Sequence, residues 1–375
     1  MRTIVIKRVT SNMRNSLIII SLLISSLLTY NLYLNNKKAS FTQPRAQVNI
    51  TPVISISLVP SPTTSPVSES NIRPIAIGMW TQGFWDDAKK ELHPEKLTEV
   101  EQLIDKKFAI AHYYRGWDVL DKETVKNELN SITEQGWTPM LSANPYYFDQ
   151  CRWEDRSIYQ VISEGKCDTF LQSVARNFKL FGKPLYFRFA WEMNLPNIEW
   201  GIKATKSSPE DFIAAWRHFH DIVKNEGTDN VIWVFSPNSE TNESVPYNRL
   251  YPGDDYVDWL GIDVYNWGTT QSWSSWQNFI YLFSSSYNHL VQISPNKPLM
   301  ISEVNTTDQG GNKAEWYSNL LNTEIPYKFP QIKAVVFYNE NRTLKENVNW
   351  LIDINPASLD AFKQGISNGF YTSSL

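Results

Sequence analysis

Eight short apolar runs recur between residues 73 and 375 and alternate with longer amphipathic segments. Runs of this length are typical of strands buried on both faces, and the intervening segments have the periodicity of helices. The predicted strands are residues 75–80, 108–113, 138–143, 184–190, 231–236, 259–265, 298–302 and 332–338. The predicted helices are residues 94–106, 122–135, 166–180, 209–226, 276–293 and 314–322.

Eight strand-then-helix units in about 300 residues are typical of a (β/α)8 TIM barrel, so we predict an α/β fold with one such domain. A doubly wound open sheet is the alternative. Residues 78–83, Gly-Met-Trp-Thr-Gln-Gly, disfavour it, because they are not the Gly-rich phosphate-binding turn that follows the first strand of a nucleotide-binding sheet.

Residues 1–38 have the pattern of a targeting segment. Basic residues precede an uncharged stretch at residues 15–36, whose most apolar part is residues 17–28. This pattern predicts a signal peptide or an N-terminal membrane anchor, with the rest of the chain secreted or membrane-anchored outside the cytoplasm. Residues 39–72 are rich in Ser, Thr and Pro and are expected to be a disordered linker, which leaves residues 73–375 for the barrel domain.

The aromatic content indicates the class of ligand. The chain has 15 Trp, 18 Tyr and 18 Phe, and a net charge of −4. Many of these rings fill the core, but indole faces also stack on the C–H faces of sugars, so we expect several Trp to line a groove. The body of the chain has no Lys/Arg cluster, and we therefore expect no nucleic-acid partner.

Cys151 and Cys167 are the two cysteines of the chain. Outside the cytoplasm a disulfide between them is expected and would stabilise the fold by about 3 kcal/mol; two free thiols are the alternative. The His and Cys residues do not have zinc-site spacing, so we expect no metal and no cofactor.

The active site of such barrels lies at the C-terminal ends of the strands. The side chains predicted there are mostly neutral hydrogen-bonding groups and aromatic rings, with a few carboxylates, and this set suits a polysaccharide. They are Trp80, His112, Tyr113, Tyr114, Asn144, Trp191, Glu192, Asn194, Asn238, Asp263, Tyr265, Trp267, Glu303, Asn305, Asn339 and Glu340.

Glu192 and Glu303 follow the fourth and the seventh predicted strand. Glycosidic cleavage needs one protonated carboxyl for the leaving oxygen and one ionised carboxyl to attack the anomeric carbon or to activate water. Side-chain alternation along strands puts Glu192 on the face of Arg188, and Glu303 on the face of Ile301. If these faces point inward, Tyr265 can donate a hydrogen bond to Glu303. Glu340 is the alternative nucleophile.

Three segments resemble glycoside hydrolase family 26, the β-mannanase family, and the resemblance covers residues 74–365. Residues 188–194, Arg-Phe-Ala-Trp-Glu-Met-Asn, are similar to that family's Arg-x-x-His-Glu-Met-Asn; residues 261–266 are similar to its Gly-Ile-Asp-x-Tyr-Asn, and residues 297–303 to the segment that ends in the nucleophile. The resemblance implies that Glu192 is the acid/base, Glu303 the nucleophile and Tyr265 its partner. Trp200 and Gly201 resemble a Trp-Gly pair of the mannanase substrate site.

The resemblance further implies a retaining endo-β-glycanase that acts on β-1,4-mannan by double displacement. Trp191 departs from the family pattern, because it replaces a His that helps to bind the sugar next to the scissile bond. Mixed-linkage β-glucan and β-1,3-xylan, which other members hydrolyse, are therefore alternative substrates. The remaining predicted substrate-binding residues are Trp80, His112, Asn144, Arg188, Asn194 and Trp267.

Two other functions remain open for the same residues. A non-catalytic carbohydrate-binding barrel would keep the aromatic residues but would not need both acids, and a transglycosylase would need both. Under each function the expected partner is a polysaccharide. The chain is expected to be a monomer and to contact a membrane only through an uncleaved N-terminal segment.

Overall fold

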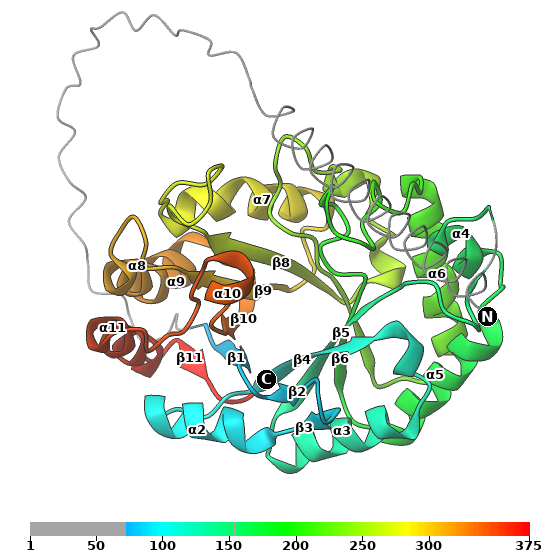
Figure 1. Ribbon diagram of the computed structural model, residues 1–375, viewed down its shortest axis with the longest axis horizontal. Coiled ribbons are helices and arrows are strands. Elements are labelled where there is room, and N and C mark those ends of the chain that lie inside the picture. The colour runs from blue at the N-terminus through cyan, green and yellow to red at the C-terminus, as the bar shows by residue number, and fades with distance from the viewer. Residues whose placement is uncertain (1–72, 153–154) are drawn as a thin grey trace, which may run out of the picture. The chain divides into compact units, whose positions relative to one another are not determined.

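The computed structural model describes residues 73–152 and 155–375, so the predicted targeting segment and linker lie outside the described residues. Eight parallel strands form a closed barrel with the helices around it (Figure 1). The pairing of the last strand with the first closes the barrel. The strands are β1 (Ile75–Thr81), β4 (Ile110–Gly116), β5 (Thr138–Asn144), β6 (Leu185–Phe189), β7 (Val231–Phe235), β8 (Trp259–Asn266), β9 (Leu299–Thr306) and β10 (Ile332–Asn339). The predicted (β/α)8 barrel is therefore confirmed.

Helices follow the strands and form the outer layer (Figure 1). They are α2 (Pro94–Ile104), α3 (Glu123–Glu134), α4 (Ile158–Ser163), α5 (Asp168–Phe181), α6 (Pro209–Asn225), α7 (Phe279–Ile293), α8 (Lys313–Asn319), α9 (Ile325–Lys328), α10 (Thr343–Glu346) and α11 (Pro356–Ser367). Several of them begin at capping residues that the sequence provides locally. In α6, Pro209 occupies the first turn, and Ser208 and Asp211 form a reciprocal capping box.

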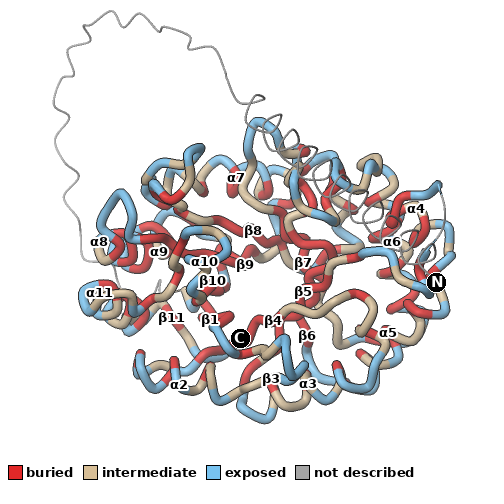
Figure 2. Tube along the Cα trace, in the orientation of Figure 1, coloured by how far each residue is buried: buried red, intermediate tan, exposed pale blue. Residues whose placement is uncertain are grey.

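The side chains of the strands divide between two apolar layers. A small inner layer fills the barrel with residues such as Ile110, Met140 and Met300. A larger outer layer packs the other face of the strands against the helices. Figure 2 shows the same division, with buried strands and helices that expose their outer sides. Gly78 is required in the inner layer, because a Cβ there would lie 2.7 Å from the Ile110 side chain.

Several short elements were not predicted. Helix α4 begins after Ser157, whose side chain caps it. The longer helix α11, also not predicted, begins after Asn355, whose side chain accepts a hydrogen bond from the Ser358 N–H. The predicted helix at residues 314–322 is interrupted, since a π-helical turn at Leu320–Glu324 separates α8 from α9. The short strands β2 (Trp85–Asp86), β3 (Glu91–Leu92) and β11 (Tyr371–Thr372) are too brief for periodicity to reveal.

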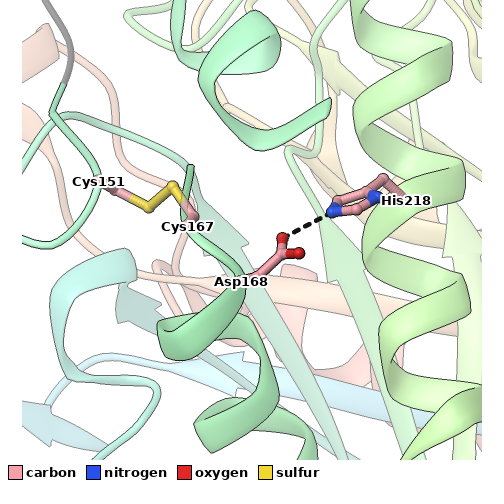
Figure 3. Close-up of a disulfide and its surroundings, with 4 residues drawn as sticks. All are labelled: Cys151, Cys167, Asp168 and His218. Atoms are coloured by element: carbon pink, nitrogen blue, oxygen red, sulfur yellow. Dashed lines mark hydrogen bonds and ion pairs between the residues drawn. A yellow bond between two sulfur atoms is a disulfide. The ribbon is translucent and has the colours of Figure 1, made fainter. Parts of the chain in front are cut away.

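Cys151 and Cys167 form a disulfide that joins the loop after β5 to the start of α5 (Figure 3). The next residue, Asp168, lies 2.7 Å from the His218 ring on α6. The segment between β5 and α5 is thus held to the outer layer at one end.

In the described ranges, 73–152 and 155–375, we find no helix with the length and apolar character needed to cross a membrane.

Candidate active site

A groove of about 1840 Å³ opens at the C-terminal ends of the strands. Both predicted catalytic acids, Glu192 and Glu303, line it. Six of the predicted substrate-binding residues line it as well: Trp80, Asn144, Trp191, Trp200, Tyr265 and Trp267. Loops that are far apart in the sequence thus bring these side chains to one surface.

Glu192 reaches the groove through a turn and not through strand alternation. Strand β6 ends at Phe189, and both Ala190 and Glu192 have left-handed backbone conformations, with φ of 51° and 56°. The Glu192 N–H donates to the Ser236 carbonyl at 2.8 Å, and this bond helps to hold the turn. Such φ values are strained for residues with a Cβ, and strain of this kind clusters at functional sites. The expected continuation of the Arg188 face through Ala190 to Glu192 was therefore wrong.

Glu303 reaches the groove through an irregularity in β9. Between β8 and β9 the register shifts, so that Ile262 pairs with Ile301 whereas Asp263 pairs with Glu303. Ile301 packs in the outer layer, while the Glu303 carboxylate points to the groove. The two residues do not share a face, because the extra residue of a bulge reverses the alternation that follows it.

Two donors hold the Glu303 carboxylate. Arg188 Nη1 donates to Oε1 at 2.7 Å, and the Tyr265 hydroxyl donates to Oε2 at 2.6 Å. Both contacts favour the ionised carboxylate. Burial and the charge of Glu303 raise the pKa of the Tyr265 hydroxyl well above its usual value, so the hydroxyl remains a donor at neutral pH. This environment suits a nucleophile that must be ionised.

Arg188 is fully buried beneath the groove and connects several strands. Its guanidinium also donates to Asp263, to Ser236 Oγ at 3.1 Å and to Ser142 Oγ at 3.0 Å. Burial, with the Arg188 charge as a second cause, lowers the pKa of His112 well below its usual value, so the ring is neutral. Its Nε2 can therefore accept from Arg188 Nη1 at 3.2 Å.

Three predicted substrate-binding residues are placed elsewhere. His112, Arg188 and Asn194 are buried and do not line the groove. Arg188 donates to Glu303, and His112 contacts Arg188. Asn194 donates to the Asn238 carbonyl and accepts from the Asn238 N–H, both at 2.9 Å. Strand-end position identified His112 and Asn194, and the family resemblance identified Arg188, but neither signal distinguished groove residues from those that orient them.

The environment of Glu192 differs from that of Glu303. Its neutral donor is Asn238, whose Nδ2 contacts Glu192 Oε1. Burial, with the charge of Glu303 as the next cause, raises the pKa of Glu192 to about 7. One acid is thus stabilised in its ionised form by a cation, while the other is favoured in its neutral form. Environments that separate two carboxyl groups in this way assign the roles of acid and base.

Trp191 is part of an aromatic wall next to Glu192. Its ring lies 4.4 Å from that of Trp200 and 5.2 Å from that of Tyr114, measured between centroids. The Trp200 indole also donates to the Trp191 carbonyl at 2.5 Å. Trp191 therefore presents a packed ring where a His would present a polar group.

Glu340 also lines the groove. It accepts from the Trp80 indole at 3.2 Å and from the Tyr338 hydroxyl at 2.5 Å, and its other oxygen lies 3.7 Å from Arg342. These partners indicate that Glu340 orients Trp80 and pairs with Arg342. The contacts of a nucleophile, Arg188 and Tyr265, are at Glu303 instead.

Some groove residues escaped the sequence-based assignment of roles. Asn238, Tyr114 and Tyr338 stood at predicted strand ends without a role, and Trp273 lies in a loop beyond them. For Trp273, the sequence offered one signal: it lies six residues after Trp267, which ends the Tyr-Asn-Trp segment at residues 265–267.

Across the two described ranges, no cluster of His, Cys, Asp and Glu side chains could hold a metal ion.

The chain matches proteins of known classification. The profile of "Glycosyl hydrolase family 26" matches residues 159–344. Endoglucanase H of Acetivibrio thermocellus is 34% identical over 273 residues, which make up 72% of this chain and 28% of that protein. A mannan endo-1,4-β-mannosidase of Bacillus subtilis strain 168 is 27% identical over 165 residues, or 42% of this chain and 40% of that protein. The chain thus spans less than half the length of either relative.

A solved structure shares the fold. The catalytic domain of the GH26 endo-β-1,4-mannanase of Bacillus sp. JAMB-750 superposes with a TM-score of 0.59 at 18% sequence identity, over 80% of this chain and 87% of that one. The solved structure thus shows the shared fold, and the matching profile and relatives show that the chain belongs to glycosyl hydrolase family 26.

Proposed function

We propose that this protein is a retaining endo-β-glycanase that hydrolyses a β-linked polysaccharide. The observation that carries the proposal is the pair of acids in one groove with opposite environments. Arg188 and Tyr265 favour an ionised Glu303, whereas burial raises the pKa of Glu192 to about 7. Family membership adds support.

The reaction follows from these two environments. Glu303 attacks the anomeric carbon while the glycosidic C–O bond breaks and Glu192 gives its proton to the leaving oxygen. Glu192, now ionised, takes a proton from water, whose oxygen attacks the anomeric carbon and displaces Glu303. The first step leaves Glu303 esterified and Glu192 ionised, and the second step returns both carboxyl groups to their starting states. Retention requires carboxyl groups about 5–5.5 Å apart, a distance that a crystal structure would test.

The groove supports endo action on a long chain. Its lining extends from Trp85, after β1, to Trp273, after β8, and includes residues from most of the loops between them. A substrate can therefore contact the protein on both sides of the catalytic acids. The mixture of aromatic faces and neutral amides in the lining suits an uncharged sugar polymer.

Two substrates are supported by different observations. β-1,4-Mannan is the first candidate, because mannan endo-1,4-β-mannosidases are among the relatives and the Glu-Met-Asn segment resembles theirs. A β-glucan is the second. The relative with 34% identity is named an endoglucanase, and Trp191 presents a ring in place of the expected His.

The direct test is hydrolysis of mannan, mixed-linkage β-glucan and β-1,3-xylan by wild type and by Glu303→Gln. We expect the variant to lose activity by about 10³-fold or more, because its amide cannot form the glycosyl-enzyme. Glu243→Gln, an exposed carboxylate outside the groove, is the matched control and should keep full activity. NMR of the first product should show the β-anomer.

The other outcomes separate the alternatives. Binding without hydrolysis of any polymer would establish a carbohydrate-binding barrel in place of an enzyme. Longer products formed when sugar acceptors are added would indicate a transglycosylase, and an α-anomer would indicate inversion.

We also propose that the chain acts outside the cytoplasm as a monomer, secreted or held at the membrane by residues 1–38. The support is the pattern of basic and apolar residues in that segment. The Cys151–Cys167 disulfide adds to it, since disulfides persist in oxidising compartments. Fractionation of the producing cells and light scattering of the purified chain would test both points.

A further inference from the structure

The groove continues beyond the catalytic acids along a row of aromatic rings. Tyr265, the hydrogen-bond donor to Glu303, lies 5.0 Å from Trp350 between ring centroids. Trp350 lies 5.0 Å from Trp267, and Trp267 lies 5.5 Å from Trp273. All four line the groove. Trp350 is buried, Trp267 is half-buried and Trp273 is 70% exposed, so the row leads from the catalytic centre to the rim.

Trp273 is exposed on a loop that is firmly held. Within the loop, Ser274 Oγ donates to the Gly268 carbonyl at 2.8 Å. Across the groove rim, Gln271 Nε2 donates to the Glu346 carbonyl at 2.6 Å, and Asn347 Nδ2 donates to the Thr270 carbonyl at 3.1 Å. An aromatic ring on such a loop binds a ligand with little loss of conformational entropy.

Neutral polar residues near Trp273 in the sequence line the same groove. They are Gln271, Ser274, Ser275 and Gln277. Amides and hydroxyls can exchange hydrogen bonds with sugar hydroxyls, and an indole face matches the C–H face of a pyranose. Tyr281, which is 77% exposed, adds a second ring to this lining.

We propose that Trp267 and Trp273 form a distal platform that binds a pyranose unit of the polysaccharide away from the bond that is cleaved. The inference rests on the proposed function of the groove. Trp267 separates the Trp273 ring from Tyr265, because its ring lies 6.4 Å from Tyr265 and 5.5 Å from Trp273, so Trp273 lies beyond the residues that hold Glu303. The platform therefore contributes to binding of long chains and not to the chemical step.

The kinetic test compares a polymer with a short substrate in wild type, Trp273→Ala and Trp273→Phe. For the polymer that wild type hydrolyses, we expect Trp273→Ala to raise KM about fivefold to tenfold with kcat unchanged. Trp273→Phe should recover most of the loss. With the matching aryl β-bioside, a chromogenic substrate of two sugar units, all three proteins should give the same kcat/KM. Tyr327→Ala, an aromatic residue that is 51% exposed on α9 and outside the groove, is the control.

A binding test separates this inference from the proposed function. In the Glu303→Gln background, native gels that contain glucomannan or mixed-linkage β-glucan should retard the parent more than the Trp273→Ala protein. The platform would be overturned if every gel retarded the parent and the Trp273→Ala protein equally, or if both had the same KM for the polymer. An equal loss of kcat/KM on the polymer and on the aryl bioside would also overturn it. If wild type hydrolyses no polymer, the proposed function fails, and the gels still decide whether Trp273 binds the glycan.

Discussion

At the scale of single residues, the two catalytic acids differ through their contacts and not through their position in the sequence. Both come after an apolar run of the sequence, yet Glu303 accepts a hydrogen bond from the Arg188 guanidinium while Glu192 accepts one from the Asn238 amide. A cation favours the ionised carboxylate more than a neutral donor does. At Glu192, burial raises the pKa by more than the hydrogen bond from Asn238 lowers it. The difference between acid and nucleophile is therefore made by residues from other parts of the barrel.

This difference predicts the pH dependence of the reaction. Glu192 must be protonated when substrate binds, and burial with the charge of Glu303 raises its pKa to about 7, so kcat/KM should fall as the pH rises through about 7. Asn238 stabilises the ionised form, which lowers the pKa. Asn238→Ala should therefore move the alkaline limb to higher pH, as measured by pH profiles of kcat/KM on the preferred polymer.

Asn197→Ala is the control for this profile, because it removes an exposed amide of the same groove. Its alkaline limb should coincide with that of wild type. A limb that moves to lower pH in Asn238→Ala would contradict the assignment of Glu192 as the acid.

At the scale of elements, the strands were predictable and the local departures from them were not. Each of the eight strands is an apolar run of its own, so the barrel could be derived from the sequence. The bulge before Glu303 and the left-handed residues Ala190 and Glu192 depend on pairing with neighbouring strands, which no local pattern encodes. These departures aim both acids into the groove. Burial could not be predicted either, because strand-end position did not reveal that His112 and Asn194 are buried.

The disulfide is the element-scale feature with a direct consequence for stability. It closes a segment with a sequence separation of 16, and removal should cost about 3 kcal/mol through the entropy of the unfolded chain. None of the described residues of this segment lines the groove, and it contains neither catalytic acid. We expect Cys151→Ser/Cys167→Ser to melt several degrees below wild type in calorimetry and to retain kcat.

Reductant provides the control for that experiment. It should lower the melting temperature of wild type towards that of the double variant and leave the double variant unchanged. Equal melting temperatures without reductant would mean that the bridge does not stabilise the fold.

At the scale of the whole molecule, the barrel buries ionisable groups that serve no step of the proposed reaction, and Lys313 is one of them. It lies at the start of α8 with its ammonium 5.5 Å from the centre of the Tyr317 ring, and its Nζ makes no hydrogen bond within the described ranges. Burial lowers its pKa to about 7, against the attraction of Asp308 and Asp353. Charging this amine therefore opposes folding of the whole domain.

The consequence is a stability that rises with pH. Between about pH 7 and 10 the unfolded chain holds a proton on Lys313 that the folded chain has released, so raising the pH favours the folded state; below about pH 7 the full penalty remains. Lys313→Met should thus be more stable than wild type at pH 6–7 by a few kcal/mol, and the gain should shrink towards pH 10. Urea unfolding of both proteins at several pH values measures the difference, in which the contributions of other groups cancel. Lys328→Met, at an exposed position of α9, is the control and should show no such trend. If the stability gained by Lys313→Met did not vary with pH, Lys313 would be charged in the folded protein throughout this range.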